Sequence, residues 1–344
     1  MITDDTLREG MQTPGIAFTM GEKLTLARLI SEAGIKRALV SYPVAHISEY
    51  EVTEKIIKNH YFDETFGLGR TLKEDIDRIY STGANISLHL PFKIDDMNII
   101  RENVRYASKK GGKLEIGIVD IDQYNISELI KICSAMEESG ANILQIPDTK
   151  GITPPEKYGK IITALRKSVK TEIEIHCHND AGYAIMNAYE GIKSGADYID
   201  TTLFGTGERN GISDSMIISK MLNDYEIEKI NINKLKTAYD YMLGLILNKI
   251  GSEFFLNNYP LYGKNTSIHT AGTHASFGNI FRGNNYSVNV YTGRSMIKNI
   301  LNENNINFDP SKLNIIVNKI KDYSCETGRA LELNDIIKIS GEMN

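Results

Sequence analysis

Cysteine is scarce in this sequence, and long apolar runs are missing from it. The 344 residues include three cysteines, Cys133, Cys177 and Cys325, and no two of them form a CxxC pair. This spacing excludes a disulfide framework and is typical of a protein in a reducing compartment. No stretch is apolar enough to read as a signal segment or long enough to cross a bilayer. We therefore expect a cytoplasmic protein without a membrane partner.

Clusters of basic residues are also missing. The net charge is −5, and lysine and arginine are scattered along the chain. Nucleic-acid binding needs a concentrated basic surface, so the sequence argues against that class of partner. A composition of 41% hydrophobic and 24% charged residues is that of an ordinary globular protein. The length allows one large domain and a smaller one, and an enzyme is the class that fits best.

One phrase recurs along the first two hundred residues. It reads SEAGIKRALV at 31–40, STGANISLHL at 81–90, ESGANILQIP at 138–147 and KSGADYIDTT at 193–202. Each copy holds a helix end, a glycine suited to the left-handed cap, a short connection and an apolar run. Four more apolar runs, at 2–4, 64–70, 113–120 and 172–179, bring the expected strands to eight. The helix at 20 is expected to begin with a capping box from Thr19, and the helix at 72 with one from Thr71.

Eight strand–helix repeats predict an α/β protein with a (β/α)8 TIM barrel. A doubly wound open sheet is the competing architecture, but it rarely needs eight uninterrupted units. The repeat stops near residue 250, where a segment rich in Asn, Gly and Tyr precedes a helical end. We expect a catalytic barrel at 1–250 and a mixed, helical subdomain at 251–344 that packs closely on the barrel or on a neighbouring subunit.

Polar residues gather where the predicted strands end, which is where barrels place their chemistry. His176 and His178 lie two apart, so a strand presents both on one face. A hydrogen-bonded strand end is the simpler interpretation of an isolated His-x-His. Glu9 and Arg8 follow the first strand, the barrel neighbour of the eighth, and favour a metal site instead. Two histidines and one carboxylate suit a divalent ion such as Mg²⁺, Mn²⁺ or Zn²⁺ acting as a Lewis acid.

The run GTGERNG at 205–211 follows the last predicted strand. It is not a dinucleotide loop, because Asn210 stands where the third glycine belongs and the run lies late in the fold. A tight turn that shapes the barrel mouth and a direct substrate contact both stay open. His46, His60 and His89 are isolated in the sequence, so we expect them to be structural or surface residues.

Several of these stretches together resemble the DRE-TIM metallolyases, which include homocitrate synthase, 2-isopropylmalate synthase, citramalate synthase and 3-hydroxy-3-methylglutaryl-CoA lyase. The matching stretches are DDTLREGMQTPG from Asp4, HCHNDAGYAIMNAYEGIKSGADYIDTTLFGTGERNGI from His176, HTAGTHA at 269–275 and YTGRS at 291–295. Glu at position 9 and the run GERNGI are similar to homocitrate synthases. HTAGTHA is similar to the condensing members rather than the lyases.

The resemblance implies a metal-dependent acyltransferase that condenses acetyl-CoA with a 2-oxo acid and then hydrolyses the thioester. It implies an amino-acid biosynthetic role and a homodimer whose C-terminal subdomain contributes to the active site. The implied metal ligands are Glu9, His176 and His178. The implied substrate contacts are Thr149, for the oxo-acid carboxylate, and Gln12. The implied catalytic residues are Arg8, for charge on oxygen, and His274 and Tyr286, for proton transfer at the acetyl group.

Two departures from the family pattern bear on the substrate. Gly117, in IGIVDID, stands where homocitrate synthases carry an arginine for the far carboxylate of 2-oxoglutarate. Asp120 or Asp122 is expected to take the acid role of that strand, and Asp120 is the first choice. The second strand, ALVSYP, lacks the family's glutamate. We therefore expect an acceptor other than 2-oxoglutarate. A carbon–carbon bond lyase and a non-catalytic metal-binding relative are the alternative functions.

Overall fold

The structure is a computed structural model that describes residues 1–270 and 285–341. Eight parallel strands form a closed barrel in chain order. The strands are β1 (Ile2–Asp4), β2 (Arg37–Ser41), β3 (Glu64–Arg70), β4 (Asn85–His89), β5 (Leu114–Gly117), β6 (Ile143–Asp148), β7 (Glu172–Cys177) and β8 (Tyr198–Thr201). The predicted TIM barrel is therefore confirmed, and the open sheet is excluded.

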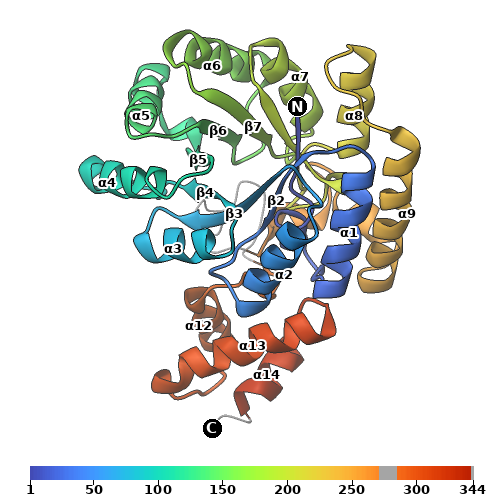
Figure 1. Cartoon of the computed structure of the whole chain (residues 1–344). Coiled ribbons are helices and arrows are strands. Elements are labelled where there is room, and N and C mark those ends of the chain that lie inside the picture. Colours follow the sequence, from blue (N-terminus) through green and yellow to red (C-terminus); the bar gives the residue numbers. More distant parts are fainter. Residues whose placement is uncertain (271–284, 342–344) are drawn as a thin grey trace.

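Eight helices surround the barrel (Figure 1). They are α1 (Met20–Glu32), α2 (Ile47–Lys58), α3 (Lys73–Ser81), α4 (Met97–Ser108), α5 (Ile126–Glu138), α6 (Pro155–Ser168), α7 (Ala184–Lys193) and α8 (Ser215–Asp224). The recurring glycines Gly34, Gly83, Gly140 and Gly195 have φ between 83° and 104° where helices turn into strands. Only glycine adopts this backbone routinely, which is why the phrase recurs.

One of the two predicted capping boxes is correct. Thr19 accepts from the Glu22 amide, and the Glu22 side chain accepts from the Thr19 amide. Thr71 does not cap α3, whose N-cap residue is Leu72. The Thr71 hydroxyl donates to the carbonyl of His89 instead, at 2.8 Å. The prediction for Thr71 was wrong because a partner on the neighbouring strand competes with the helix amides, and the sequence does not show that partner.

The chain after the barrel wraps beside it and then below it in Figure 1. Helix α9 (Ile232–Lys249) packs against α1, and α10 (Phe254–Asn257) follows. Two short parallel strands, β9 (Ile268–His269) and β10 (Asn285–Tyr286), lead to α12 (Arg294–Glu303), α13 (Leu313–Thr327) and α14 (Leu333–Gly341). The last three helices enclose their own apolar cluster, which includes Ile297, Leu301, Ile316 and Ile320. This part therefore has a core separate from that of the barrel.

The barrel interior holds a buried ion cluster below the strand ends. The Arg37 guanidinium lies 2.7 Å from Glu115, 2.6 Å from Glu174 and 2.8 Å from Glu64. The guanidinium carbon Cζ of Arg37 lies 4.1 Å from the ring centroid of Phe66 and 4.4 Å from that of Tyr198. A planar, delocalised cation suits this position between two rings and several carboxylates.

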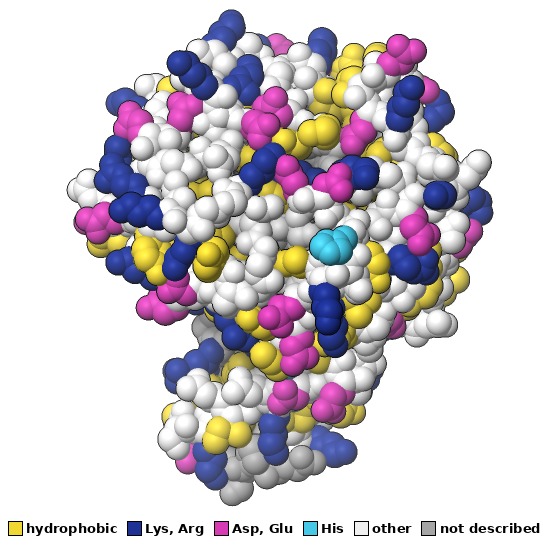
Figure 2. Space-filling model, viewed as in Figure 1, with side chains coloured by type: hydrophobic (Ala, Val, Ile, Leu, Met, Phe, Trp, Pro, Cys, Tyr) yellow, Lys and Arg dark blue, Asp and Glu magenta, His cyan; other side chains and the backbone are white. Residues whose placement is uncertain are grey.

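The surface carries interspersed charges on the face that Figure 2 shows, without a broad patch of one sign. This agrees with the scattered basic residues of the sequence. Across residues 1–270 and 285–341, no helix is long and apolar enough to pass through a bilayer.

Asp4 makes the stability of the barrel depend on pH. It ends β1, and burial raises the pKa of Asp4 to about 7, although Thr6 donates two hydrogen bonds to it. The unfolded chain releases this proton near pH 3.9. The folded state therefore binds more protons between these values, and its stability falls as pH rises from 4 to 7. Between pH 4.5 and pH 7.5 the free energy of unfolding of the wild type is expected to fall by on the order of 2 kcal/mol more than that of the Asp4→Asn variant, which has no such proton to release. Urea denaturation of both proteins at pH 4.5 and pH 7.5 measures this difference. An equal change in the free energy of unfolding for the wild type and the variant would contradict the assignment.

Candidate active site

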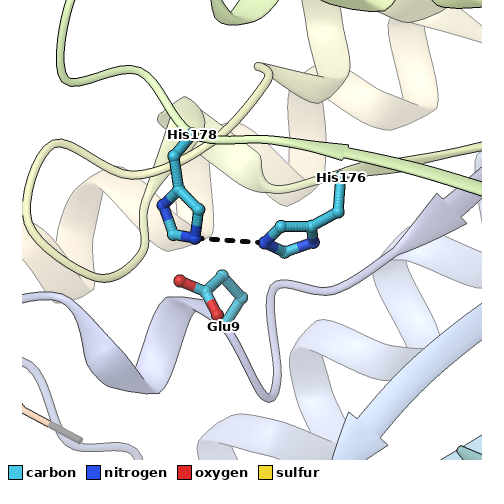
Figure 3. A group of neighbouring side chains, drawn as sticks. All are labelled: Glu9, His176 and His178. Carbon is cyan, nitrogen blue, oxygen red and sulfur yellow. Dashed lines mark hydrogen bonds between the residues drawn. The ribbon is translucent and has the colours of Figure 1, made fainter. Parts of the chain in front are cut away.

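Glu9, His176 and His178 converge at the carboxyl end of the barrel (Figure 3). His176 lies in β7, His178 directly follows that strand, and Glu9 begins the short turn after β1. One ligand atom from each lies within 4.8 Å of the other two. All three are buried, with exposed fractions of 1%, 5% and 2%. The structure thus brings together the three residues that the sequence singled out as metal ligands.

The geometry of these donors fits a divalent cation. The Nε2 atoms of His176 and His178 lie 3.3 Å apart. Two nitrogen ligands at tetrahedral positions around one Zn²⁺ lie about 3.3–3.4 Å apart, given metal–nitrogen bonds of 2.0–2.1 Å. Burial, with Arg8 nearby, lowers the pKa of His176 well below its ordinary value. The imidazole is therefore neutral, which is the form that binds a metal.

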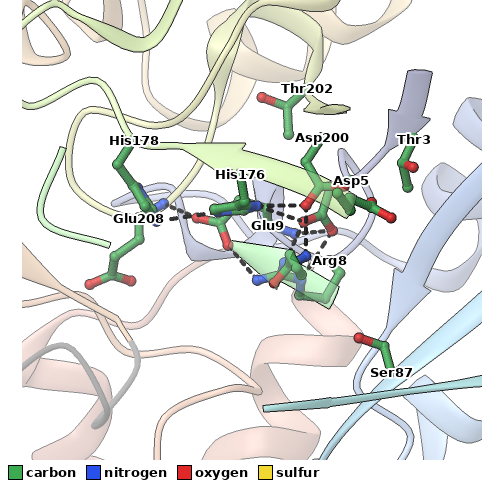
Figure 4. Close-up of polar contacts among 12 residues, drawn as sticks. Thr3, Asp5, Arg8, Glu9, Ser87, His176, His178, Asp200, Thr202 and Glu208 are labelled. Carbon is green, nitrogen blue, oxygen red and sulfur yellow. Dashed lines mark hydrogen bonds and ion pairs between the residues drawn. The ribbon is translucent and has the colours of Figure 1, made fainter. Parts of the chain in front are cut away.

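Asp200 on β8 orients His176. Its Oδ2 lies 2.8 Å from His176 Nδ1 and accepts a hydrogen bond from Gln145 Nε2, also at 2.8 Å. Figure 4 shows this carboxylate on the side of the imidazole away from His178. A carboxylate on Nδ1 fixes the proton there and leaves Nε2 as the metal-binding atom.

Arg8 is held beside the metal ligands by its neighbours on the same loop. Its guanidinium donates two hydrogen bonds to the Asp5 carboxylate, one from Nε at 3.0 Å and one from Nη2. Nη1 donates a third to the Glu9 carboxylate at 2.5 Å. Nη1 also donates to Gln12 Oε1 at 3.1 Å. Figure 4 shows Arg8 between Asp5 and Glu9. Arg8 is 4% exposed, and its remaining surface faces the cavity described below.

The GTGERNG run is a scaffold for the site. The Glu208 amide donates to Glu9 Oε1 at 2.8 Å, and the Glu208 carboxylate accepts from Gln12 Nε2 at 3.2 Å. Arg209 forms two bonds with Asp180, at 2.7 Å and 2.9 Å. Neither Glu208 nor Arg209 lines the cavity. Of the two interpretations left open, the structure favours the turn that shapes the barrel mouth.

A glycine is required inside this run. A Cβ on Gly207 would lie 2.8 Å from Glu9 Oε1, closer than real Cβ contacts come. The loop can therefore pass directly over the metal-ligand carboxylate only because residue 207 lacks a side chain.

A cavity of about 530 Å3 opens from the metal ligands toward the surface. Its polar end is lined by Arg8, Glu9, Gln12, His89, Gln145, Thr149, His176 and His178. The rest is lined mainly by apolar side chains, with Tyr42, Arg70, Thr71 and Asn103 among them; the apolar residues include Leu68, Leu72, Leu90, Phe92, Ile99, Ile100 and Val119. Tyr291 and Gly293 reach it from the C-terminal part of the chain. Tyr291 is fixed by its hydroxyl, which donates to Glu49 on α2 at 2.8 Å.

Asp120, its alternative Asp122 and Tyr286 are not among the described residues that line the cavity. Asp120 has φ 53°, and its carboxylate pairs with Lys150 at 2.9 Å rather than lining the cavity. Asp122 pairs with Lys157 at 2.9 Å. Tyr286 packs against the C-terminal apolar cluster. The catalytic roles expected for Asp120 and Tyr286 therefore stay predictions, and so does that of His274, which lies outside the described residues.

His89 was expected to be a structural or surface residue, and the structure shows that it does not lie on the outer surface. It ends β4 and lines the cavity near Arg8. Burial, with a smaller effect of Arg8, lowers the pKa of His89 to about 3, so the imidazole is neutral. The strand-end rule applied to STGANISLHL would have found it. The signal for Tyr291 was the YTGRS segment at 291–295, since Tyr291 does not follow a barrel strand.

Comparison with known proteins agrees with this arrangement. The family model described as HMGL-like matches residues 1–241, which contain the barrel, the three candidate ligands and Arg8. This chain belongs to the HMGL-like family.

Curated relatives extend the likeness of this HMGL-like protein beyond the barrel. A homocitrate synthase of Sulfurisphaera tokodaii is 30% identical over 93% of this chain and 75% of its own length. A probable 2-isopropylmalate synthase of Archaeoglobus fulgidus is 28% identical over 97% of this chain and 71% of its own. The homocitrate synthase AksA of Methanocaldococcus jannaschii is 31% identical over 79% of this chain and 70% of its own. These relatives are all named as synthases, which supports the expectation that this chain is an enzyme.

Solved structures share the fold of this HMGL-like protein. The HMG-CoA lyase of Bacillus subtilis has a TM-score of 0.63 at 17% identity and covers 71% of this chain and 92% of its own. The carboxyl transferase domain of Rhizobium etli pyruvate carboxylase has a TM-score of 0.63 at 15% identity, covering 76% of this chain and 51% of its own. At these identities the likeness concerns the fold alone.

Proposed function

We propose that this protein is a metal-dependent acyltransferase that condenses acetyl-CoA with a 2-oxo acid. The observation that carries the proposal is the buried Glu9, His176 and His178 cluster, with Arg8 beside it, at one end of a cavity. The relatives named homocitrate synthase and 2-isopropylmalate synthase support it. A divalent cation on these three residues would supply a Lewis acid for the keto oxygen of the acceptor.

Arg8, Thr149 and Gln12 would orient the acceptor and stabilise charge. Arg8 presents a fixed cation, already oriented by Asp5, to the negative charge that forms on the keto oxygen. The Thr149 hydroxyl accepts a hydrogen bond from the Asp120 amide at 2.9 Å, so its own proton is available for the acceptor's carboxylate. Gln12 is held by Arg8 and Glu208 and lines the same end of the cavity.

A base must remove one proton from the acetyl methyl group, whose carbon then bonds to the keto carbon. Water subsequently cleaves the thioester and releases CoA. Among the described residues, the cavity is lined by one carboxylate, Glu9, which is committed to the metal cluster. His89, with a pKa near 3, is too weak a base. His274 remains our candidate for the base, and the homodimer remains a prediction.

The acceptor is proposed to lack a second carboxylate. A Cβ on Gly117 would lie 2.7 Å from His89 Cδ2 and 2.9 Å from Gln145 Oε1, so no arginine fits there without rearrangement. Within the described part of the chain, Arg70 is the other cation at the cavity besides Arg8. Asp75 accepts two bonds from it, both at 2.8 Å. A dicarboxylate would bury a charge that neither cation is placed to balance.

CoA release tests this function. The protein is mixed with acetyl-CoA, Mn²⁺ and, separately, pyruvate, 2-oxobutyrate, 2-oxoisovalerate and 2-oxoglutarate, and free thiol is followed. We expect release with at least one monocarboxylic acceptor and a weaker response to 2-oxoglutarate. Cleavage of a 3-hydroxyacyl-CoA without condensation would favour the lyase alternative. Bound metal without either reaction would favour the non-catalytic one.

A further inference from the structure

The apolar part of the cavity has an inner section lined by buried side chains. Leu68 on β3, Leu90 after β4, Ile100 on α4 and Val119 after β5 face it, and each is 8% exposed or less. These four side chains come from three adjacent strands and the helix above them. Leu90 is the residue after His89, which lies at the polar end, so the chain of an acceptor held at the metal cluster would run among these four side chains.

Two exposed apolar side chains and that of Arg70 lie at the outer rim of the same cavity. Leu72 is 42% exposed and Ile99 is 56% exposed, yet both line the cavity. They lie at the beginnings of α3 and α4, where polar residues would normally meet the solvent. Isolated exposed apolar residues need no explanation, but two that continue a buried apolar wall indicate a path for an apolar ligand.

The loops that carry this rim are fixed. Thr71 donates to the carbonyl of His89 at 2.8 Å, and Asn103 on α4 donates to the carbonyl of Thr71 at 2.9 Å. Arg70 is tied to Asp75 by two bonds. The path is therefore preformed, as ligand cavities usually are.

We propose that the acceptor is a 2-oxo acid with a long, unbranched, apolar chain that runs from the metal cluster to the rim of Leu72 and Ile99. This inference rests on the proposed function and specifies its substrate. Cavities of about 300–1,000 Å3 enclose drug-sized ligands, whereas an acceptor as small as pyruvate fills only the polar end. At 530 Å3 the cavity admits an extended chain beside the reacting acetyl group.

A series of straight-chain acceptors tests the inference. CoA release is measured with pyruvate, 2-oxobutyrate, 2-oxopentanoate, 2-oxohexanoate and 2-oxooctanoate at saturating acetyl-CoA. Each methylene moved into the apolar wall is expected to raise kcat/KM by about two- to fourfold, until the chain passes the rim. A value that is flat or falls beyond 2-oxobutyrate would overturn the inference while leaving the condensation itself established. No release with any acceptor would instead sink the proposed function.

A pair of matched variants assigns the effect to the rim. Ile99 is the third residue of α4 and Ile217 the third of α8, with exposed fractions of 56% and 51%. Ile99→Asp is expected to lower the ratio of kcat/KM for 2-oxooctanoate to that for pyruvate at least fivefold. Ile217→Asp, away from the cavity, should keep the wild-type ratio. If Ile99→Asp instead raises the KM for acetyl-CoA and leaves the ratio alone, the rim binds the CoA arm and the inference is wrong.

Discussion

Replacing Arg8 by lysine is expected to lower kcat about 100- to 1,000-fold, which is typical of losing one fixed donor to a developing oxyanion. Lysine keeps the positive charge that compensates Asp5 and Glu9, so the fold should survive. It cannot reproduce the planar fork that bonds Asp5, Glu9 and Gln12 at once. Steady-state CoA release measures the effect.

The control for this variant is Arg28→Lys, because Arg28 is 47% exposed and pairs with Glu32 on the surface of α1. That change should leave kcat as it is. Calorimetric titration with Mn²⁺ should show that Arg8→Lys still binds the ion. A kcat within threefold of the wild type would mean that Arg8 does not stabilise the reacting oxygen.

Replacing Arg37 by methionine is expected to lower the free energy of unfolding by about 3–5 kcal/mol, the usual cost of removing one partner of a buried ion pair. The change leaves Glu115 and Glu174 without their cationic partner, although these side chains are only 2% and 1% exposed. It also removes the cation between Phe66 and Tyr198. Urea denaturation at pH 7 measures the loss.

Arg28→Met serves as the surface control, with an expected loss below about 1 kcal/mol. Replacing Glu115 and Glu174 by glutamine in the Arg37→Met background should recover part of the loss, because it removes the stranded charges. Equal stability of Arg37→Met and Arg28→Met would show that the buried cluster contributes nothing.

The sequence alone predicted what depends on local, periodic signals. The glycine after each helix marks a left-handed cap, so the αβ joints and the barrel could be read directly. His176 and His178 share a face because strand side chains alternate. Glu9 joins them because the first and last strands pair in a closed barrel, as the Thr3–Asp200 register shows.

The sequence did not show the surroundings of residues whose neighbours lie far away along the chain. The φ of 53° at Asp120 turns its carboxylate to Lys150, and nothing in IGIVDID shows this backbone. His89 looked isolated because its neighbours, Arg8 and Gln145, come from other strands. Tyr291 comes from the C-terminal part of the chain, and its hydroxyl bonds Glu49, more than two hundred residues earlier.

The central claim is that one divalent ion on Glu9, His176 and His178 enables condensation, and a metal titration of CoA release tests it most directly. Protein stripped by a chelator is supplied with acetyl-CoA and 2-oxobutyrate or a longer acceptor, and Mn²⁺ is added stepwise. We expect no thiol release at the start and a rise that breaks at one ion per chain, with His178→Gln showing no such break. Full activity in the stripped protein, or an unchanged break in His178→Gln, would contradict the claim.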